Sequence, residues 1–141
     1  MKKTAVVYWS GTGNTEAMAN AVLEGMKAAG ADAQMMTSAD ADKATLAGMD
    51  AVAFGCPAMG AEELEETEFA PMFGSVKDAL NGKSVSLFGS YGWGDGEWMR
   101  TWEEECKNSG MNLVCESVTC CEAPDDTALD ACRDLGKELA K

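Results

Sequence analysis

The sequence predicts an α/β protein whose mainly parallel sheet is covered by helices on both faces. Two residue periods alternate from end to end, because short β-rich runs are separated by segments with the helical spacing of apolar residues. Several of these stretches are followed by glycine, which indicates where each one stops. Strands that alternate with helices imply right-handed crossovers and therefore parallel strands. At 141 residues, the chain is expected to form one domain over 1–141.

The first third of the chain contains two predicted strands and one predicted helix. Thr4–Trp9 is rich in strand-forming residues, and Ala33–Met36 is a weaker strand. Asn14–Ala29 has apolar residues on one helical stripe, and Gly30 stands where a helix-ending glycine is expected. The buried stripe of this helix is predicted to be Met18, Val22, Met26 and Ala29.

The alternation continues through the rest of the chain. Ala51–Phe54 and Ser84–Phe88 are apolar runs that end at a glycine, and Leu113–Val118 is predicted as the fifth strand. Glu97–Asn108 is predicted as a helix followed by Gly110. Its expected core residues, spaced by four, are Trp98, Trp102 and Cys106.

A last helix is predicted near the C-terminus. Pro124 is placed near its first helical position, with Asp125 and Asp126 in its first turn. Its buried stripe is expected to be Leu129, Cys132, Leu135 and Leu139. In such sheets, ligands bind beyond the carboxyl ends of the strands, where the strand order reverses. The loops after the first, third and fourth strands are therefore the places to look for a site.

The composition is globular but strongly acidic. A net charge of −13 repels phosphate backbones and anionic lipid, so nucleic acid and membrane are excluded as partners, and a partner with a basic patch is favoured. The six cysteines form no CxxC pair and the chain has no histidine, so no metal site is expected. The cysteines are expected in or near the core. The apolar stretch Ala5–Trp9 is too short for a secretory signal, so a cytoplasmic location is expected.

The loop after the first strand suits a phosphate. Its sequence is Ser10-Gly11-Thr12-Gly13-Asn14-Thr15. The loop leads into a helix whose free N–H groups and dipole attract an anion, and its hydroxyl and amide side chains add donors. It lacks the Lys of a nucleotide-hydrolase loop, the sixth-position Gly of a dinucleotide fingerprint, and the Cys and Arg of a phosphatase loop. Neither the first nor the third strand ends in the Asp of a receiver domain.

The other two loops suit a flat aromatic ligand. They read Cys56-Pro57-Ala58-Met59-Gly60-Ala61-Glu62 and Gly89-Ser90-Tyr91-Gly92-Trp93-Gly94-Asp95-Gly96. Met59 is a flexible thioether that can lie against a ring, and Gly60 reaches backbone conformations closed to other residues. Trp93 offers a stacking face worth about 0.5–1.5 kcal/mol beyond its burial.

In these three loops and in the order of its elements, the chain resembles the short-chain flavodoxins, most closely those of anaerobic clostridia and their relatives. The motifs that carry the resemblance are residues 7–16, 58–60 and 89–96. The resemblance implies a flavodoxin-like three-layer α/β/α sandwich with a five-stranded parallel sheet in the order 2-1-3-4-5. It also implies flavin mononucleotide (FMN) as a non-covalent cofactor at the point where the strand order reverses.

The resemblance assigns a role to each loop. The first loop and Ser90 would hold the phosphate, Trp93 would stack on one face of the flavin ring, and Met59 would cover the other. Glu62 would accept a hydrogen bond from the flavin N3, and backbone N–H groups around Gly92 would face the pyrimidine end. The residues expected to bind FMN are Ser10, Gly11, Thr12, Gly13, Asn14, Thr15, Ala58, Met59, Gly60, Ala61, Glu62, Ser90, Tyr91, Gly92, Trp93 and Gly94. Ala61 stands where close relatives often carry Asp. Cys120 and Cys121 occupy a loop that in relatives carries polar side chains.

The implied function is low-potential one-electron transfer, mainly between the semiquinone and hydroquinone states of FMN, with no substrate of its own. Gly60 would let the next peptide turn toward flavin N5, and the acidic run after Met59 would oppose a second negative charge on the ring. One carboxylate about 8 Å away contributes roughly 2 kcal/mol at an effective dielectric near 20. Most carboxylates of this run are expected to be solvated, with Glu62 as the exception. The expected partners are redox proteins with basic docking patches, such as reductases and ferredoxin-dependent enzymes, and the chain is expected to be a monomer.

Two other functions stay open. An FMN-dependent NAD(P)H reductase would need a cavity over the flavin and a nicotinamide site, but the three loops contain no Arg or Lys to bind a second nucleotide. A non-redox binding module of the same fold would carry no tightly bound yellow chromophore.

Overall fold

The structure is a computed structural model that describes residues 2–59, 63–92 and 96–141. Its strands are β1 (Lys3–Tyr8), β2 (Asp32–Thr37), β3 (Ala51–Gly55), β4 (Ser84–Tyr91), β5 (Asn112–Leu113) and β6 (Val118–Cys121). They form a parallel sheet in the order β2-β1-β3-β4-β5, and β6 pairs with the far end of β4. The predicted strand order 2-1-3-4-5 is confirmed.

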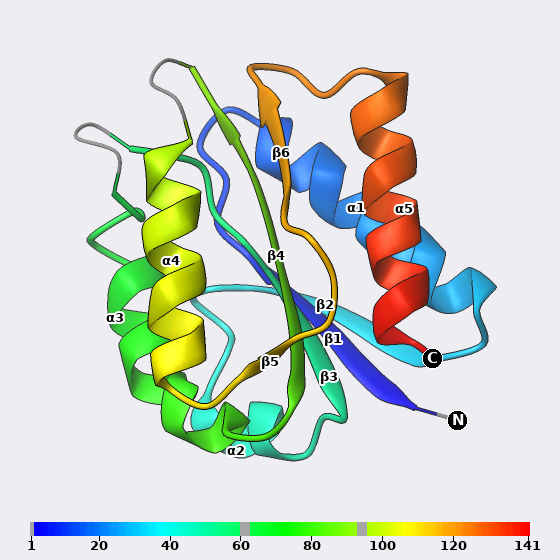
Figure 1. The fold of residues 1–141 in the computed structure, drawn as a ribbon, viewed down its shortest axis with the longest axis vertical. Coiled ribbons are helices and arrows are strands. Elements are labelled where there is room, and N and C mark those ends of the chain that lie inside the picture. The colour runs from blue at the N-terminus through cyan, green and yellow to red at the C-terminus, as the bar shows by residue number, and fades with distance from the viewer. Residues whose placement is uncertain (1, 60–62, 93–95) are drawn as a thin grey trace.

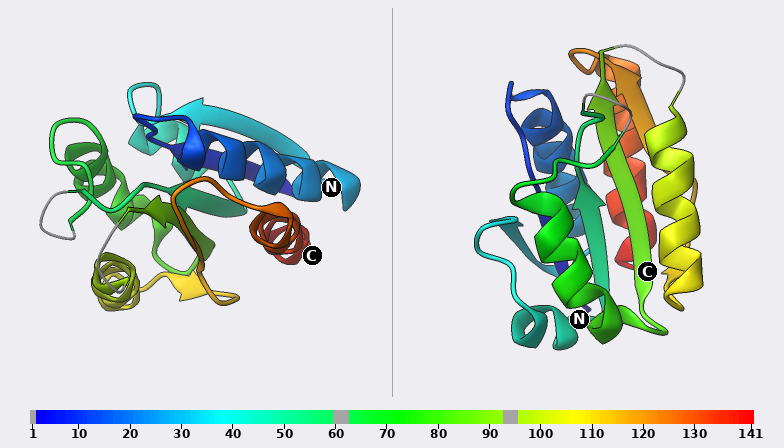
Figure 2. Two further views of the ribbon diagram at one scale, coloured as in Figure 1. Left: turned by 90° about the horizontal axis from the view of Figure 1, so that it is seen from above. Right: turned by 90° about the vertical axis from the view of Figure 1, so that its left-hand side faces the viewer.

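Helices lie on both faces of this sheet (Figures 1 and 2). Their bounds are Asn14–Ala28 for α1, Lys43–Ala47 for α2, Phe69–Val76 for α3, Glu97–Asn108 for α4 and Asp126–Leu139 for α5, with a short 3₁₀ turn, η1, at Lys77–Leu80. In the views, α1 and α5 cover one face, while α3 and α4 cover the other. The predicted three layers are therefore present in the described residues.

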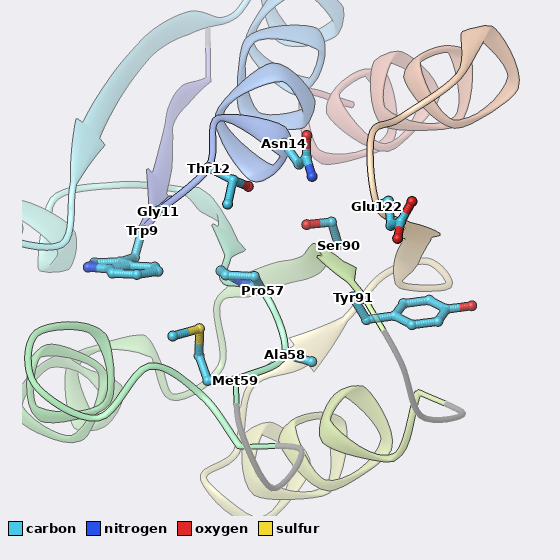
Figure 3. Close-up of a pocket in the computed structure, with 11 residues that line it drawn as sticks. Trp9, Gly11, Thr12, Asn14, Pro57, Ala58, Met59, Ser90, Tyr91 and Glu122 are labelled. Atoms are coloured by element: carbon cyan, nitrogen blue, oxygen red, sulfur yellow. The ribbon is translucent and has the colours of Figure 1, made fainter.

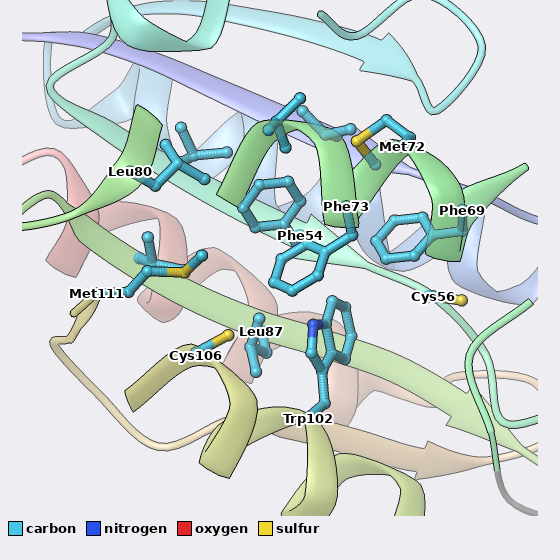
Figure 4. Packing of buried hydrophobic residues seen from close by; sticks show 14 of the residues in the cluster. Phe54, Cys56, Phe69, Met72, Phe73, Leu80, Leu87, Trp102, Cys106 and Met111 are labelled. Carbon is cyan, nitrogen blue, oxygen red and sulfur yellow. The ribbon is translucent and has the colours of Figure 1, made fainter. Parts of the chain in front are cut away.

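Each face of the sheet has its own hydrophobic cluster, because successive strand residues point to opposite sides. The cluster under α3 and α4 is aromatic (Figure 4): the ring centroids of Phe54 and Phe73 are 5.1 Å apart at 89°, and Trp102 meets Phe69 edge-on at 5.4 Å. The cluster under α1 and α5 is mainly aliphatic and sulfur-containing, and its members include Val6, Met18, Val22, Met26, Cys132 and Leu135.

The predicted fifth strand at Leu113–Val118 is wrong in its bounds. The edge of the sheet is made by two short pieces, β5 and β6, on either side of residues 114–117. Leu113 pairs with Val85, and Val118 pairs with Phe88. The chain therefore advances five residues at the edge of the sheet while β4 advances three. The edge therefore has two residues more than β4 over this stretch, a larger interruption than a single-residue bulge, and here the Cys115 thiol contacts the Ser86 hydroxyl at 3.1 Å.

Three smaller predictions also differ from the structure. Ala29 is exposed, because it is the C-cap of α1 rather than part of its buried stripe, and Leu129 is only half-buried. Pro124 precedes the cap of α5; the cap is Asp125, whose side chain accepts a hydrogen bond from the Ala128 N–H at 2.8 Å. Gly30 does follow α1, with φ +89° as expected for a helix-ending glycine.

Candidate functional site

A cavity of about 330 Å³ lies at the carboxyl ends of β1, β3 and β4 (Figure 3). The predicted site residues that line it are Gly11, Thr12, Asn14, Ala58, Met59, Ser90, Tyr91 and Gly92. Trp9, Pro57 and Glu122 line it as well and were not predicted. The cavity therefore joins the three loops at the position where a doubly wound sheet binds its ligand.

The loop at the start of α1 has the geometry of an anion-binding turn. Gly13 is the N-cap of α1 with φ +96°, a conformation that favours glycine, and this N-cap residue has no side chain to cap the helix. Ser10 Oγ accepts hydrogen bonds from the N–H groups of Gly13 at 3.1 Å and Glu16 at 3.3 Å. Ser10 and Gly13 thus shape the loop from outside the lining, while Thr12 and Asn14 face the cavity.

The first and fourth loops are joined by two buried hydroxyls. Thr15 Oγ1 and Ser90 Oγ lie 3.3 Å apart, and Thr15 is 1% exposed. Thr15 does not line the cavity, and its contact positions Ser90, which does; its predicted contact with a phosphate stays a prediction. A phosphate at this turn would meet Thr12, Asn14 and the start of α1.

The third loop is tied to the fourth by the backbone. The N–H of Ala58 donates to the carbonyl of Ser90 at 3.0 Å. Met59 and Glu63 exchange two backbone hydrogen bonds of 2.9 and 3.1 Å, which form an isolated antiparallel bridge. The Met59 side chain is 37% exposed, the only large hydrophobic residue exposed among those described. A planar ligand could cover it.

Trp9 provides a second apolar surface at this end of the cavity. In Figure 3, Trp9 and Met59 lie on one side, and Tyr91 and Glu122 lie on the other. A Cβ on Gly11 would be 3.1 Å from the indole of Trp9, so the loop backbone lies directly against this ring. Trp9 could have been predicted from its place at the strand end, beside the glycine-rich turn.

Tyr91 and Trp98 form the support behind the fourth loop. Their ring centroids are 5.5 Å apart at 53°. Trp98 is 1% exposed and its Nε1 donates to the carbonyl of Cys56 at 3.2 Å, which links α4 to the end of β3. Trp98 and Trp102 are therefore core residues, as predicted.

Glu122 has an unusual backbone conformation. It has φ 59°, and it is the only non-glycine residue with positive φ in the described part of the chain. Its N–H donates to the carbonyl of Tyr91 at 2.7 Å, which continues the pairing of β6 with β4 past the end of the strand. Glu122 lines the cavity, whereas Cys120 and Cys121 do not. No pattern in the sequence indicates this conformation.

Five predicted site residues lie outside the described residues: Gly60, Ala61, Glu62, Trp93 and Gly94. The roles assigned to them, including the stacking of Trp93 and the N3 contact of Glu62, stay predictions. The other assignments of individual residues to FMN also stay predictions, although the structure places those residues in or beside one cavity.

The acidic run after the third loop contains one buried carboxylate. Glu63, Glu66 and Glu68 are exposed, as expected for a solvated run, but Glu65 is only 5% exposed. Burial opposes its ionisation. The hydrogen bonds from the Thr67 hydroxyl and from the backbone N–H groups of Phe69, Glu68 and Thr67 outweigh this effect and lower the pKa of Glu65 to about 2. Among the described residues that line the cavity there is no Lys or Arg.

The cysteines follow the core expectation in part. Cys56, Cys106 and Cys132 are buried, and burial raises the pKa of each thiol to about 12, which keeps it protonated. Cys121 is exposed. Within the described residues, no group of three or more acidic, cysteine or histidine side chains could hold a metal.

A parallel α/β sheet with a glycine-capped helix start and apolar surfaces around one edge cavity is typical of a nucleotide-binding protein of the doubly wound class. The family model described as Flavodoxin matches residues 6–136. The chain therefore belongs to the flavodoxin family, whose members carry FMN and transfer electrons to redox partner proteins.

Individual relatives agree over nearly the whole chain. The flavodoxin of Megasphaera elsdenii is 45% identical over 136 residues, which cover 96% of this chain and 97% of the relative. The solution structure of its two-electron reduced form superposes with a TM-score of 0.90 at 44% identity, over 97% and 98% of the two chains. The flavodoxin of Clostridium beijerinckii is 42% identical over 135 residues, 96% of this chain and 97% of the relative.

A larger protein also contains a similar segment. The coenzyme F420H(2) oxidase of Methanothermobacter marburgensis is 27% identical over 99% of this chain but only 35% of its own length. The greatest similarity among these proteins is therefore to flavodoxins of this chain's size.

Proposed function

We propose that this protein is a low-potential one-electron carrier that holds FMN in the edge cavity and exchanges electrons with other proteins. The observation that supports this most is the cavity itself. One end is the start of α1 behind a glycine N-cap, suited to a phosphate, and the other is formed by Trp9 and the exposed Met59, suited to a flat ring. When bound, FMN supplies the redox chemistry, and the protein supplies binding, orientation and charge.

Individual residues are proposed to bind the two ends of the cofactor. Thr12 and Asn14 donate to the phosphate from the lining of the cavity, and the rest of the predicted phosphate turn completes the site: Ser10, Gly11, Gly13, Thr15 and Ser90. Met59 covers one ring face and Trp93 the other, with Gly60 and Glu62 acting near the ring as the family resemblance implies. Ala58, Ala61, Gly92 and Gly94 complete the backbone around the ring.

The low potential is proposed to come from uncompensated negative charge. The lining includes the carboxylate of Glu122, and the phosphate would have no Lys or Arg among the described lining residues. A second electron would add negative charge to a ring in this acidic setting, so the hydroquinone is disfavoured relative to neutral surroundings. We expect the carrier to work mainly between the semiquinone and hydroquinone states.

We propose that the partners are redox proteins with basic patches, and that the carrier acts as a monomer with no substrate of its own. The supporting observation is the net charge of −13, which favours encounter with positively charged surfaces. A cytoplasmic location and a single domain over 1–141 stay predictions of the sequence. The described part of the chain contains no helix with the length and apolarity needed to span a membrane.

The experiment that tests this proposal is a stepwise dithionite titration of the purified protein, followed by absorption spectroscopy. The protein should bind one FMN and show a semiquinone band that rises and then falls as electrons are added. Failure of the apoprotein to take up FMN would overturn the proposal.

The same sample distinguishes the reductase alternative. An electron carrier should be reduced slowly by NADH or NADPH alone and rapidly when a flavin reductase is added. Rapid reduction by the nicotinamide nucleotide without a second protein would show that the chain has a substrate site of its own.

A further inference from the structure

Met59 lies in the segment between Cys56 and Glu65, two residues that do not line the cavity and that are joined to each other by a hydrogen bond. Cys56 is the residue after β3, and the N–H of Glu65 donates to its thiol sulfur at 3.3 Å. The same thiol donates to the carbonyl of Pro57 at 3.5 Å. Cys56 is 0% exposed, and its contact with the Glu65 N–H is buried, where a polar group without a partner is costly.

The Glu65 carboxylate fixes the second end of this segment. Its Oε1 accepts from the N–H groups of Glu68 at 2.7 Å and Phe69 at 2.9 Å, and its Oε2 accepts from the N–H of Thr67 at 2.9 Å and from the Thr67 hydroxyl. These donors lie at the start of α3, which has no side-chain cap from its own N-cap residue. The carboxylate therefore joins the segment to the first turn of α3.

Cys56 itself is held from the opposite side. Its N–H donates to the carbonyl of Phe88 at 3.2 Å, and its carbonyl accepts from Trp98 Nε1 at 3.2 Å. A Cβ on Gly89 would lie 2.2 Å from the Cys56 carbonyl oxygen, so β4 passes directly against it. The thiol that receives the Glu65 N–H is thus fixed to the sheet.

Between these two ends, the hydrogen bonds of Met59 with other described residues are made by its backbone. Its hydrogen bonds are those exchanged with Glu63, two residues before Glu65, and its side chain is 37% exposed. A long unbranched side chain with this exposure has several accessible rotamers, so its mean position depends on where the backbone beneath it is placed.

We propose that Cys56 and Glu65 are positioning residues for Met59: by joining the two ends of the segment, they set the thioether against the cofactor without touching it. The proposal rests on the proposed FMN function. Its chemical basis is that the Glu65 carboxylate accepts four hydrogen bonds and the Cys56 thiol accepts a fifth. Replacing Glu65 or Cys56 therefore lets Glu63 and the Met59 paired with it shift together.

The test compares Glu65→Gln with Glu66→Gln. Glu66 is the adjacent residue and is exposed, so its substitution removes the same charge without removing the contacts of Glu65. Cys56→Ala is the second variant, with Cys106→Ala as its control, because both thiols are fully buried in the same cluster. The first readout is the ¹³C-methyl NMR signal of Met59 in the apoprotein, which needs no cofactor. The signal should move in Glu65→Gln and Cys56→Ala and stay in place in both controls.

The second readout is FMN affinity, measured by fluorescence titration of each apoprotein. Glu65→Gln should raise Kd about tenfold, which corresponds to about 1.4 kcal/mol. Glu66→Gln should stay within about twofold, as for most exposed substitutions. In a Met59→Ala background, Glu65→Gln should lose its effect on Kd, since Met59 is the group through which it acts.

An unmoved Met59 signal in Glu65→Gln, or an equal loss of affinity with and without Met59, would show that Glu65 only caps α3. If the unsubstituted apoprotein took up no FMN, the proposed function would fail. The NMR comparison would still report on the positioning of Met59.

Discussion

Glu65 is a buried carboxylate whose charge is compensated only by hydrogen bonds. Its pKa is lowered from 4.5 to about 2, so the folded state favours the ionised form. The stability that follows is present above about pH 4.5 and is lost as the pH falls from there toward 2. Hydrogen bonds to a charged group contribute about 1.5–3 kcal/mol.

Glu65→Gln should therefore lower the free energy of unfolding by about 2 kcal/mol at neutral pH, and by less at pH 3, where the carboxylate is largely protonated in the unfolded chain. Urea unfolding of the apoprotein at the two pH values measures this. A difference between the two proteins that stays constant with pH would contradict the assignment.

At the scale of residues, the sequence predicted which residues lie near the site better than it predicted their burial and their contacts. The turn from Ser10 to Thr15 was predicted as one unit, and the structure adds which of its hydroxyls also make contacts within the protein, namely those of Ser10 and Thr15. Glu65 was predicted to be solvated with its neighbours. Its burial depends on donors at the start of α3, which Pro71 and Gly74 make hard to predict, because neither residue favours a helix.

At the scale of elements, the contact between α1 and α5 depends on two glycines. A Cβ on Gly136 would lie 2.2 Å from the Val22 carbonyl oxygen, and a Cβ on Gly25 would lie 2.0 Å from the Arg133 carbonyl oxygen. Each glycine is buried in the last turn of its helix, where alanine would be intrinsically better. Close approach of the two helices therefore outweighs helix propensity.

Gly136→Ala should lower the free energy of unfolding by about 2 kcal/mol, because the helices must separate to admit the methyl group. Gly74→Ala is the matched control: it lies in α3 with nothing within 4 Å of the added Cβ, and it should raise stability by about 0.5–1 kcal/mol. Urea midpoints of the two variants should move in opposite directions. Shifts of the same sign would show that the close approach does not limit the packing.

The strands show why alternation predicts a sheet but not its edges. β1, β3 and most of β4 are buried on both faces, so apolar runs marked them clearly. β5 and β6 are half-exposed, and they are divided by residues 114–117, two more than β4 has opposite them. That division depends on β4 as a partner, and no local pattern contains it.

At the scale of the whole molecule, the excess of acidic residues should control encounter with partners. Raising the ionic strength from about 0.01 M to 0.15 M shortens the Debye length from about 30 Å to about 8 Å. The second-order rate of electron exchange with a basic reductase should then fall about tenfold or more. Stopped-flow absorption measures it, with a neutral small-molecule acceptor as the control. Equal salt dependence for both acceptors would argue against steering by charge.

The two hydrophobic clusters lie on opposite faces of the sheet, and the cavity draws on both. The end of the cavity proposed for the phosphate is formed by the start of α1, and α1 packs in one cluster. Trp9, Ala58 and Tyr91, which also line the cavity, pack against the other cluster. A single nucleotide spanning the cavity would act as a non-covalent cross-link between the two layers. Because binding to the folded state alone adds RT ln(1 + [L]/Kd) to stability, the holoprotein should resist unfolding of either layer separately. Loss of the nucleotide would then remove this stabilisation from both layers. Conditions that release the cofactor should therefore also shorten the time for which the protein stays folded in storage.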